Sequence, residues 1–319
     1  MRVVDAERRH RDRWDEEIDA SINGTLFHRL DFLAYHGGRF AENERHLVLL
    51  DGEEAVARLS MTIEDADGRR TARSPYGGSY GSFAFRSVPT YSKSRATVDA
   101  LIEFLITNDV DRLVLTPPIA CCSNRSLDTF TFALLESGFT SASRDVSSVV
   151  SLGDGPISVI ASSRARYAAR KAESTGVTVV HDPPIDAFWS VMKSGYIDRG
   201  RVPTHTRDEL EQLTATFPRR VRLDLAYLGH EPVAGMASFA ITATVDSSFY
   251  LCQDPIHSRT QGLSLLILQC LSRSQSEGFT YFDFGTSTAA MEARPALFQF
   301  KESFGATGMF RETFEWVRT

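Results

Sequence analysis

The first candidate for chemistry is a lysine in the stretch FQFKESFGA, residues 298–306. Read as a helix, this stretch places Leu297, Phe300 and Phe304 on one face, and Lys301 falls on that face where a fourth apolar residue is expected. A buried ammonium without a partner is costly. Either Lys301 reaches water from the rim of the core, or its charge is used. A fixed cation in a dry cleft can stabilise an oxyanion or a leaving group, or it can contact a phosphate group.

A carboxylate is expected next to this lysine. Asp283 lies in the strand-like stretch YFDFGTS (281–287), which precedes the helix of Lys301. We expect the strand to lie beside that helix, where Asp283 would orient the lysine or an acceptor amine. Asp283 and Lys301 are therefore the predicted catalytic pair.

A second candidate is the stretch RTQGLS, residues 259–264, between a strand-like segment and a helix. A helix N-terminus offers free N–H groups and a favourable dipole to a phosphate. Arg259, Gly262 and Ser264 are the predicted donor contacts, Gly262 because it would let the backbone approach the phosphate. An ordinary helix start with a turn glycine is the alternative.

A third candidate is the basic segment 161–222, in which eleven Lys and Arg residues stand against seven acids although the whole chain has a net charge of −6. Local positive charge favours contact with tRNA phosphates or CoA. Arg166 and Arg170 are the predicted donor contacts there, and Arg199 and Arg207 are predicted acceptor contacts. A solvated helix face is the alternative, because Arg166, Arg170 and Glu173 also have helical spacing.

A fourth candidate is the loop RSPYGGSYGSF, residues 73–83, at the end of a predicted strand. Its glycines and tyrosines would shape an acceptor site, with Arg73, Tyr76, Gly77 and Tyr80 as contacts. A purely structural turn is the alternative.

The remaining reactive side chains indicate no metal or disulfide chemistry. The four cysteines (Cys121, Cys122, Cys252 and Cys270) lack zinc or CxxC spacing, so we expect reduced thiols and a cytoplasmic protein. We see no secretory signal and no membrane span. The net charge of −6 argues against broad DNA coating.

These residues must be positioned by a chain that repeats itself. With an offset of 177, residues 28–57 align with 205–234 without a gap, and identical pairs include His28/His205, Phe40/Phe217 and Gly52/Gly229. The repeated histidine is interpreted as scaffold rather than as a general base. Each copy predicts a helix (29–40 and 206–217) followed by two strands joined at the turn glycine.

The later parts of the copies correspond with an offset of 166. Each predicts helix, strand, helix and strand: 98–110, 112–118, 127–139 and 144–152, then 263–279, 281–287, 295–306 and 309–317. This register places Leu135 opposite Lys301. An ionic residue at a scaffold position in only one copy favours a functional role.

Two copies of this mixed unit resemble tandem acetyltransferase (GNAT) domains. Six stretches in order resemble the FemABX family of aminoacyl-tRNA-dependent peptidyl transferases: 23–36, 74–83, 164–177, 203–210, 281–287 and 298–306. The resemblance implies an α/β (α+β) fold of two GNAT-like domains with a central cleft, here expected at 1–155 on the acceptor side and 156–319 on the donor side. It implies amide formation, with Phe300 and Lys301 stabilising the reacting carbonyl and the leaving group. RTQGLS resembles the GNAT pyrophosphate loop.

Two departures bear on the substrate. Members that act on peptidoglycan precursors carry a phosphate-binding lysine in the segment matching 31–36, which has none here. A coiled-coil arm is also missing, so a small natural-product amine is favoured over a UDP-linked cell-wall acceptor. The leading hypothesis is transfer of an aminoacyl group from aminoacyl-tRNA, as co-substrate and without a tightly bound cofactor, to a small or peptide-like amine. An acyl-CoA-dependent N-acyltransferase and a catalytically silent binding protein are the alternatives.

Overall fold

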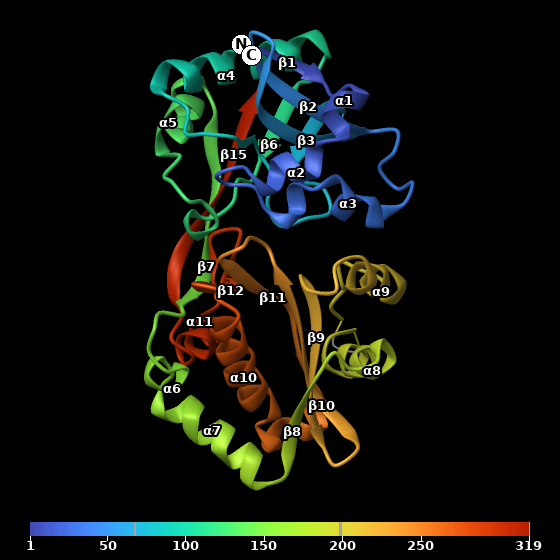
Figure 1. Ribbon diagram of the computed structural model, residues 1–319, viewed down its shortest axis with the longest axis vertical. Helices are drawn as coiled ribbons and strands as arrows, with labels where there is room; N and C mark the ends of the chain where they lie inside the picture. The colour runs from blue at the N-terminus through green and yellow to red at the C-terminus, as the bar shows by residue number, and fades with distance from the viewer. Residues whose placement is uncertain (67, 198–199, 319) are drawn as a thin grey trace. The chain divides into compact units, whose positions relative to one another are not determined.

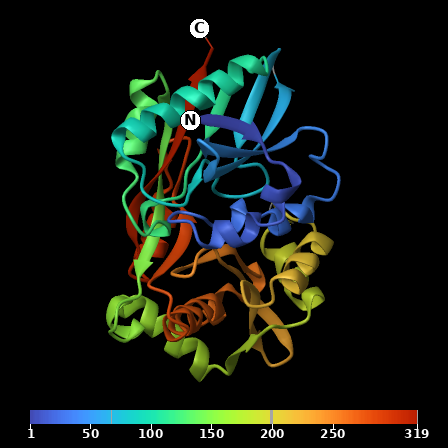
Figure 2. The same ribbon diagram turned by 45° about the horizontal axis from the view of Figure 1, so that its top comes forward.

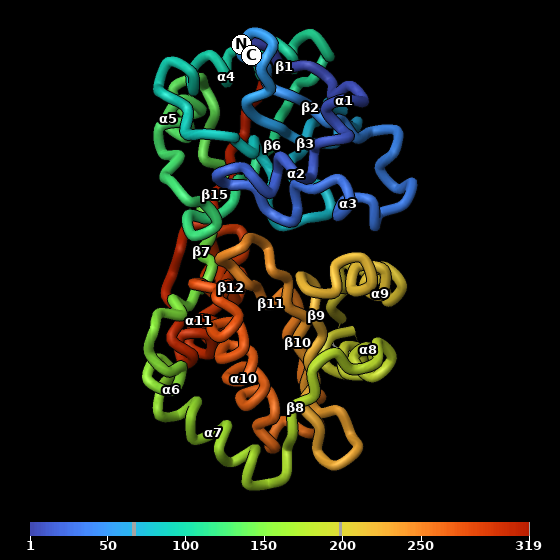
Figure 3. Tube along the Cα trace, in the orientation of Figure 1, coloured from blue at the N-terminus to red at the C-terminus, as the bar shows by residue number. Residues whose placement is uncertain are grey.

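A computed structural model describes residues 1–66, 68–197 and 200–318. The chain forms two compact units (Figures 1 and 3). Unit 1 contains Met1–Asp145 and Phe310–Thr319, and unit 2 contains Val146–Met309. Figure 2 gives a second view of the same elements. No helix within the described residues is long and apolar enough to cross a membrane.

Unit 1 is an α/β unit built on one sheet. Its strands are β1 (Arg2–Asp5), β2 (Glu44–Asp51), β3 (Glu54–Ala66), β4 (Arg69–Ser74), β5 (Ala84–Phe85) and β6 (Arg112–Leu115). Its helices are α1 (Arg8–Arg11), α2 (Trp14–Asp19), η1 (Leu26–His28), α3 (Leu30–Leu33), η2 (Ala34–His36), α4 (Tyr91–Thr107), η3 (Ala120–Cys122) and α5 (Asp128–Glu136). The sheet order is β1-β2-β3-β4-β6, closed by β15 (Thr307–Val317), and only β4 and β6 pair in parallel.

Alternation along the strands gives unit 1 two different faces. Leu47, Leu49 and Leu59 point to the face where α4 and α5 complete the main core. Val48 and Leu50 point to the other face, where Trp14 and Ile18 of α2 form a smaller cluster.

Unit 2 repeats the architecture. Its strands are β7 (Thr140–Ser151), β8 (Val177–His181), β9 (Val221–Leu228), β10 (Glu231–Ala240), β11 (Val245–Gln253), β12 (Tyr281–Thr286), β13 (Thr288–Ala289) and β14 (Glu292–Ala293). Its helices are α6 (Ile157–Ile160), α7 (Ser163–Ser174), α8 (Ile185–Gly195), α9 (Arg207–Thr216), η5 (Pro255–Thr260), α10 (Gly262–Ser276) and α11 (Pro295–Glu302). The sheet order is β8-β9-β10-β11-β12-β7, and only β11 and β12 pair in parallel.

Helices cover both faces of this second sheet (Figure 1). Ala234 and Met236 of β10 join the core formed with α7, α10 and Phe304. Gly235, between them, faces Phe188 of α8, and a Cβ there would lie 3.1 Å from the ring. The strand therefore alternates between the α10 side and the α8 side.

The two units exchange their last strands. The final strand of the first copy, β7, crosses into unit 2 and pairs with β12, whereas the final strand of the second copy, β15, crosses into unit 1 and pairs with β6. The bounds therefore differ from the expected 1–155 and 156–319: unit 1 ends at Asp145 and takes back residues 310–319. An internal repeat in the sequence cannot reveal this exchange, because each copy still contains a complete set of strands.

The predicted elements agree with the structure except near the start of the first copy. The helix predicted at 206–217 is α9, but the one predicted at 29–40 is only α3 and η2, followed by turns. Gly37, with φ of +57°, ends η2. Gly37 and Gly38 break the apolar pattern that suggested a longer helix.

The strand exchange predicts where a core substitution in β15 acts. Phe314 belongs to the second sequence copy but is buried in the core of unit 1. Phe314→Ala should cost about 3–5 kcal/mol through the cavity it leaves. Hydrogen exchange read by mass spectrometry should then increase in residues 1–145. Phe304→Ala, in the core of unit 2, is the matched control and should increase exchange in 146–309. The same response from both variants would contradict the strand exchange.

Candidate active site

The parallel strands of unit 2 separate after three residue pairs. Val245–Ser247 of β11 pair with Tyr281–Asp283 of β12, but β11 continues to Gln253 without a registered partner on that side within the described residues. Phe249 is an extra residue in the pairing with β10, since Ala237 lies opposite Tyr250 and Ser238 opposite Ser248. The bulge and the open edge leave backbone groups that can pair with an extended ligand.

The corresponding strands of unit 1 do not separate. β4 and β6 stay paired from Thr71 to Ser74, the last residue of β4, and the Thr116 N–H donates to the Ser74 carbonyl beyond that point. Within the described residues, only unit 2 of the two therefore offers the open edge.

Lys301 is buried and paired. Its side chain extends from α11, is 3% exposed, and its Nζ donates to the carbonyl oxygens of Gly285 and Thr286, each at 2.8 Å. The side chain does not snorkel, and its charge is not left without a partner. An ammonium has three N–H groups, so one beyond these two carbonyl bonds remains for a reacting oxygen.

Asp283 binds the same backbone segment through the N–H of Gly285. Its Oδ1 accepts from the Gly285 N–H at 2.8 Å and from Ser147 Oγ at 2.6 Å. Gly285 has φ of +71° and lies where the pairing between β12 and β7 shifts register, a position that favours glycine. Asp283 and Lys301 together fix the bulge at the end of β12.

Burial changes the ionisation of this lysine. It lowers the pKa of Lys301 to about 8, and nearby Arg294 acts in the same direction, whereas Asp283 opposes the shift. A lysine poised near neutral pH can exchange a proton during a reaction.

Phe300 precedes Lys301 on α11 and packs edge-on against Phe304, with ring centroids 5.2 Å apart. It is half-buried at the border of the unit 2 core. The ring therefore helps to seat α11, and its predicted contact with the reacting carbonyl stays a prediction.

The position equivalent to Lys301 in the first copy is Leu134, one residue before the Leu135 expected from the sequence. Both helices end in a left-handed glycine, Gly138 and Gly305, each with φ of +89°. The Phe139 N–H donates to the Leu134 carbonyl, and the Ala306 N–H donates to the Lys301 carbonyl in the same way. Leu135 is exposed, whereas Leu134 is 1% exposed. In this corrected register, a buried leucine of the first copy, Leu134, still corresponds to Lys301 of the second.

The N–H groups at the N-terminus of α10 are partly bound by the preceding loop. Gly262 N–H donates to Thr260 Oγ1 at 3.2 Å, and the N–H groups of Ser264 and Leu265 donate to the Gln261 carbonyl. The Leu265 bond is the first i→i−4 bond of the helix. Of the four N–H groups before it, those of Gly262 and Ser264 are bound locally, and those of Gln261 and Leu263 have no partner within the described residues.

Gly262 has a packing role. A Cβ there would lie 2.8 Å from Val233 Cγ2 and 3.5 Å from the Ala226 Cβ. Gly262 therefore lets α10 pack closely on the sheet, and the phosphate contact expected from the sequence stays a prediction. Arg259, at the end of η5, is exposed.

The two arginines predicted on α7 differ. Arg166 Nη1 donates to the carbonyl oxygens of Ser158 and Ala161, at 2.8 and 2.6 Å, and thereby ties α6 to α7. Arg170 is exposed. Arg170, rather than Arg166, has a guanidinium on the surface.

The predicted acceptor loop of unit 1 is closely packed. Tyr76 and Tyr80 are 6% and 2% exposed, and the Tyr76 hydroxyl donates to Glu44 Oε2 at 3.1 Å. At Gly77 a Cβ would lie 1.7 Å from His36 Nε2. The two rings and the glycine therefore shape the loop from inside. Arg73 is exposed on β4.

Arg207 is occupied by acids. Its guanidinium pairs with Asp186 at 2.7 Å, Asp208 at 3.1 Å and Glu211 at 2.9 Å, which ties α8 to α9. Arg199 lies outside the described residues.

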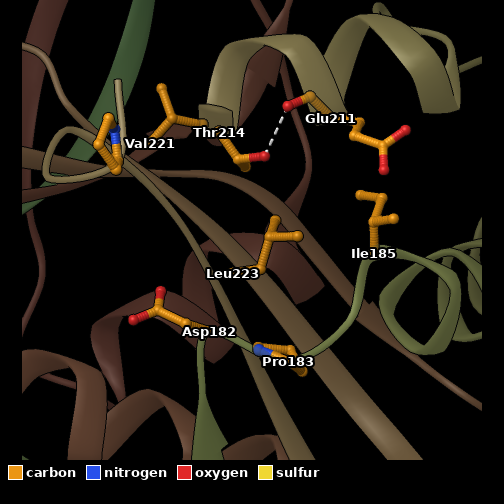
Figure 4. A pocket seen from close by; sticks show the side chains of 8 residues that line it. Asp182, Pro183, Ile185, Glu211, Thr214, Val221 and Leu223 are labelled. Carbon is orange, nitrogen blue, oxygen red and sulfur yellow. Dashed lines mark hydrogen bonds between the residues drawn. The ribbon is translucent and has the colours of Figure 1, made fainter. Parts of the chain in front are cut away.

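A cavity of about 350 Å³ includes Glu211, an ion-pair partner of Arg207, in its lining (Figure 4), but none of the predicted site residues lines it. Its lining residues are Asp182, Pro183, Ile185, Glu211, Thr214, Pro218, Val221 and Leu223.

The repeated histidines are scaffold in both units. His28 is buried between Thr25 Oγ1 and the Gly81 carbonyl, and burial lowers its pKa to about 4. His205 Nδ1 lies 2.9 Å from the Tyr250 hydroxyl. The described residues contain no cluster of three or more potential metal ligands.

Three positions near the predicted sites were missed. Gly285 was detectable, because an isolated glycine in a strand pattern indicates a bulge. No sequence pattern indicates Ser147, because its bond to Asp283 depends on the pairing of β7 with β12 in unit 2. None indicates Arg311 either: it donates to the Ser79 carbonyl at 2.6 Å and lies over the Tyr80 ring, and so anchors the 73–83 loop from β15.

The buried lysine predicts a pH-dependent stability difference. Between about pH 8 and 10.5 the unfolded chain holds the proton that folded Lys301 has lost, so wild-type stability should rise with pH relative to Lys301→Met, by up to about 3 kcal/mol. Below pH 8 the difference should be constant. Lys301→Met should also lose roughly 1–3 kcal/mol because two carbonyl groups lose their donor.

Urea unfolding at several pH values would measure both effects. Lys93→Met, which removes an exposed lysine paired with Asp51, is the control for loss of a surface charge. Parallel curves for wild type and Lys301→Met would contradict the lowered pKa.

Comparisons with known proteins agree with this architecture. A family model described as an acetyltransferase (GNAT) domain matches residues 161–314. No curated protein sequence matches the chain.

Solved structures resemble the chain over its whole length. The structure of FemX has a TM-score of 0.73 at 11% identity, covering 100% of this chain and 98% of that one. A tandem GNAT protein from the clavulanic acid biosynthesis pathway has a TM-score of 0.59 at 13% identity, with 99% and 98% covered. The C-terminal DUF2156 domain of a proposed lysylphosphatidylglycerol synthetase from Agrobacterium fabrum has a TM-score of 0.59 at 11% identity, with 94% and 92% covered.

These likenesses confirm, at the level of the fold, the resemblance to the FemABX family drawn from the sequence. The matched domain contains the open β11 edge, Asp283 and Lys301. The chain is therefore an acyltransferase of GNAT fold, with the tandem architecture that it shares with FemX.

Proposed function

We propose that the protein transfers an aminoacyl group from aminoacyl-tRNA to the amine of a small or peptide-like acceptor. Unit 2 would bind the donor, because it holds the open edge of β11 and the Lys301–Asp283 pair. Unit 1 would bind the acceptor. Charged tRNA occurs in the cytoplasm, so the proposal also places the enzyme there.

The reaction forms one C–N bond and breaks one C–O bond. The acceptor nitrogen attacks the ester carbonyl carbon, an oxyanion develops, and the ribose oxygen then leaves with the electron pair of the broken bond. The amine loses a proton, and the ribose oxygen gains one. Because the ester is already activated, the protein needs mainly to align the amine and to stabilise the oxyanion.

Lys301 is the residue to which we assign that stabilisation. It is dry, held rigidly by two carbonyl groups, and has an N–H beyond those bonds. The same ammonium, with its pKa of about 8, can deliver a proton to the leaving oxygen. Asp283 would act by positioning, since its carboxylate holds the N–H of Gly285.

The observation that favours tRNA over CoA is that the preceding loop already binds some of the backbone N–H groups at the α10 N-terminus. A pyrophosphate needs several free N–H groups, and here two of the four that precede the first helical bond, those of Gly262 and Ser264, are already bound. A Cβ at Gly262 would point into the sheet, so close packing of α10 is enough to explain this glycine. The likeness in fold to FemX is consistent with this preference.

Two further observations bear on the acceptor. Residues 31–36 contain no lysine for a nucleotide phosphate. The tandem GNAT protein from a small-molecule pathway has a similar fold. We therefore favour a natural-product amine over a cell-wall precursor.

An acyl-CoA-dependent N-acyltransferase is the second candidate. It is favoured by the description of the matched family model as an acetyltransferase domain and by the position of RTQGLS after a strand with an open edge. Lys301 would then protonate the thiolate of CoA.

The two candidates predict different donors. With hydroxylamine as a general amine acceptor, radiolabelled aminoacyl-tRNA should give an enzyme-dependent hydroxamate above the uncatalysed rate, and RNase treatment should abolish it. Lys301→Met should lower the single-turnover rate by roughly 10²–10³, as loss of one oxyanion donor typically does. Lys93→Met should keep the wild-type rate. RNase-insensitive consumption of acetyl-CoA would support the second candidate instead.

A further inference from the structure

The outward face of α7 carries an unusual combination of side chains. α7 buries only alanines, namely Ala165, Ala169 and Ala172, where it packs along α10 (Figure 1). The opposite side presents Arg164, Tyr167, Arg170 and Lys171, which we call the α7 face. All four are exposed, and Tyr167 is 65% exposed.

These side chains form one continuous surface. Tyr167 follows Arg164 by three residues and precedes Arg170 and Lys171 by three and four, which places all of them on the same side of the helix. From Arg164 to Lys171 the face is about 10 Å long. Glu173, three residues after Arg170, borders this face at its C-terminal end, but it forms no ion pair with the face among the described residues.

The cations of the α7 face have no acidic partner within the described residues. Some exposed cations elsewhere are paired: Arg8 pairs with Asp12 at 3.9 Å, and Arg9 pairs with Glu7 at 2.9 Å. Within α7 itself, Arg166 is bound to backbone carbonyls and does not belong to the face. The α7 face thus places three cations without an acidic partner around one exposed aromatic ring.

This combination fits single-stranded or looped RNA. Cations contact phosphates, and an exposed aromatic ring stacks on an unpaired base. A helix that binds a membrane surface needs large aliphatic residues on its face, and α7 contains none. The chemistry of the face thus favours RNA over an anionic lipid surface.

We propose that the α7 face binds the RNA body of the donor tRNA, away from its reacting end. This inference rests on the proposed function and adds a partner surface that the open β11 edge does not provide. Arg164, Arg170 and Lys171 would contact phosphates, and Tyr167 would stack on a base.

Binding of purified tRNA, measured by fluorescence anisotropy at several salt concentrations, tests the face directly. R164A/R170A/K171A should reduce the slope of log K against log salt by about 2–3, one contact per cation. Tyr167→Ala should weaken binding roughly five- to hundredfold, whereas Tyr167→Phe should bind like wild type because the ring stacks without its hydroxyl.

The matched control is R8A/R9A/R13A, which removes three exposed arginines that are paired with acids. It should leave tRNA affinity and slope unchanged. A triple α7 variant with wild-type affinity and slope would overturn the proposal. So would an α7-dependent affinity for phosphatidylglycerol vesicles without any effect on tRNA.

A truncated donor separates this inference from the proposed function. Aminoacyl-adenosine has no RNA body, so wild type and the triple α7 variant should consume it at the same rate. If wild type consumes neither this donor nor aminoacyl-tRNA, the proposed function fails. Loss of tRNA binding in the α7 variants would still establish the face as an RNA contact.

Discussion

The two side-chain hydrogen bonds to the backbone of Gly285 are the interactions on which the candidate site depends. Asp283 accepts from its N–H, Lys301 donates to its carbonyl, and the bulge at the end of β12 is thereby fixed. A buried ammonium is stable there only because two carbonyl groups accept from it. The same bonds hold it rigidly at the end of β12, the strand from which β11 separates, so the cation needs no reorganisation when charge develops.

The two units show how one scaffold gives different sites. In unit 1 the parallel pair stays closed and Leu134 completes an apolar core. In unit 2 the pair opens, and lysine replaces that leucine. A change at one buried position and a bulge in one strand thus distinguish a structural copy from one that can hold a donor.

Much of the fold was predictable from the sequence, because turn glycines and repeated helix–strand patterns are local signals. The open edge was not, since the bulge at Phe249 depends on pairing between β10 and β11. The strand exchange was also out of reach, because it depends on which sheet a strand joins. The helix predicted at 29–40 failed where Gly37 and Gly38 end the helical pattern.

The candidate site was predictable only in part. Lys301 could be identified because it breaks an apolar stripe, and Asp283 because it lies on the neighbouring strand. Their partners could not: carbonyl groups leave no trace in a sequence, and Ser147 comes from the other copy. Surface roles were the least predictable. Arg166 and Arg207 look like free cations in the sequence, but each is occupied by oxygens that only the folded chain brings near.

The exchanged strands also have a consequence for the order of events during synthesis. Domains generally form from the N-terminus as the chain leaves the ribosome. Unit 1 cannot follow this order, because its sheet lacks β15 until the last ten residues, 310–319, have emerged. Unit 2 is a continuous segment, 146–309, and has all its strands before that. Unit 1 is synthesised first but completes its sheet last. Until β15 has emerged, the edge of β6 stays unpaired.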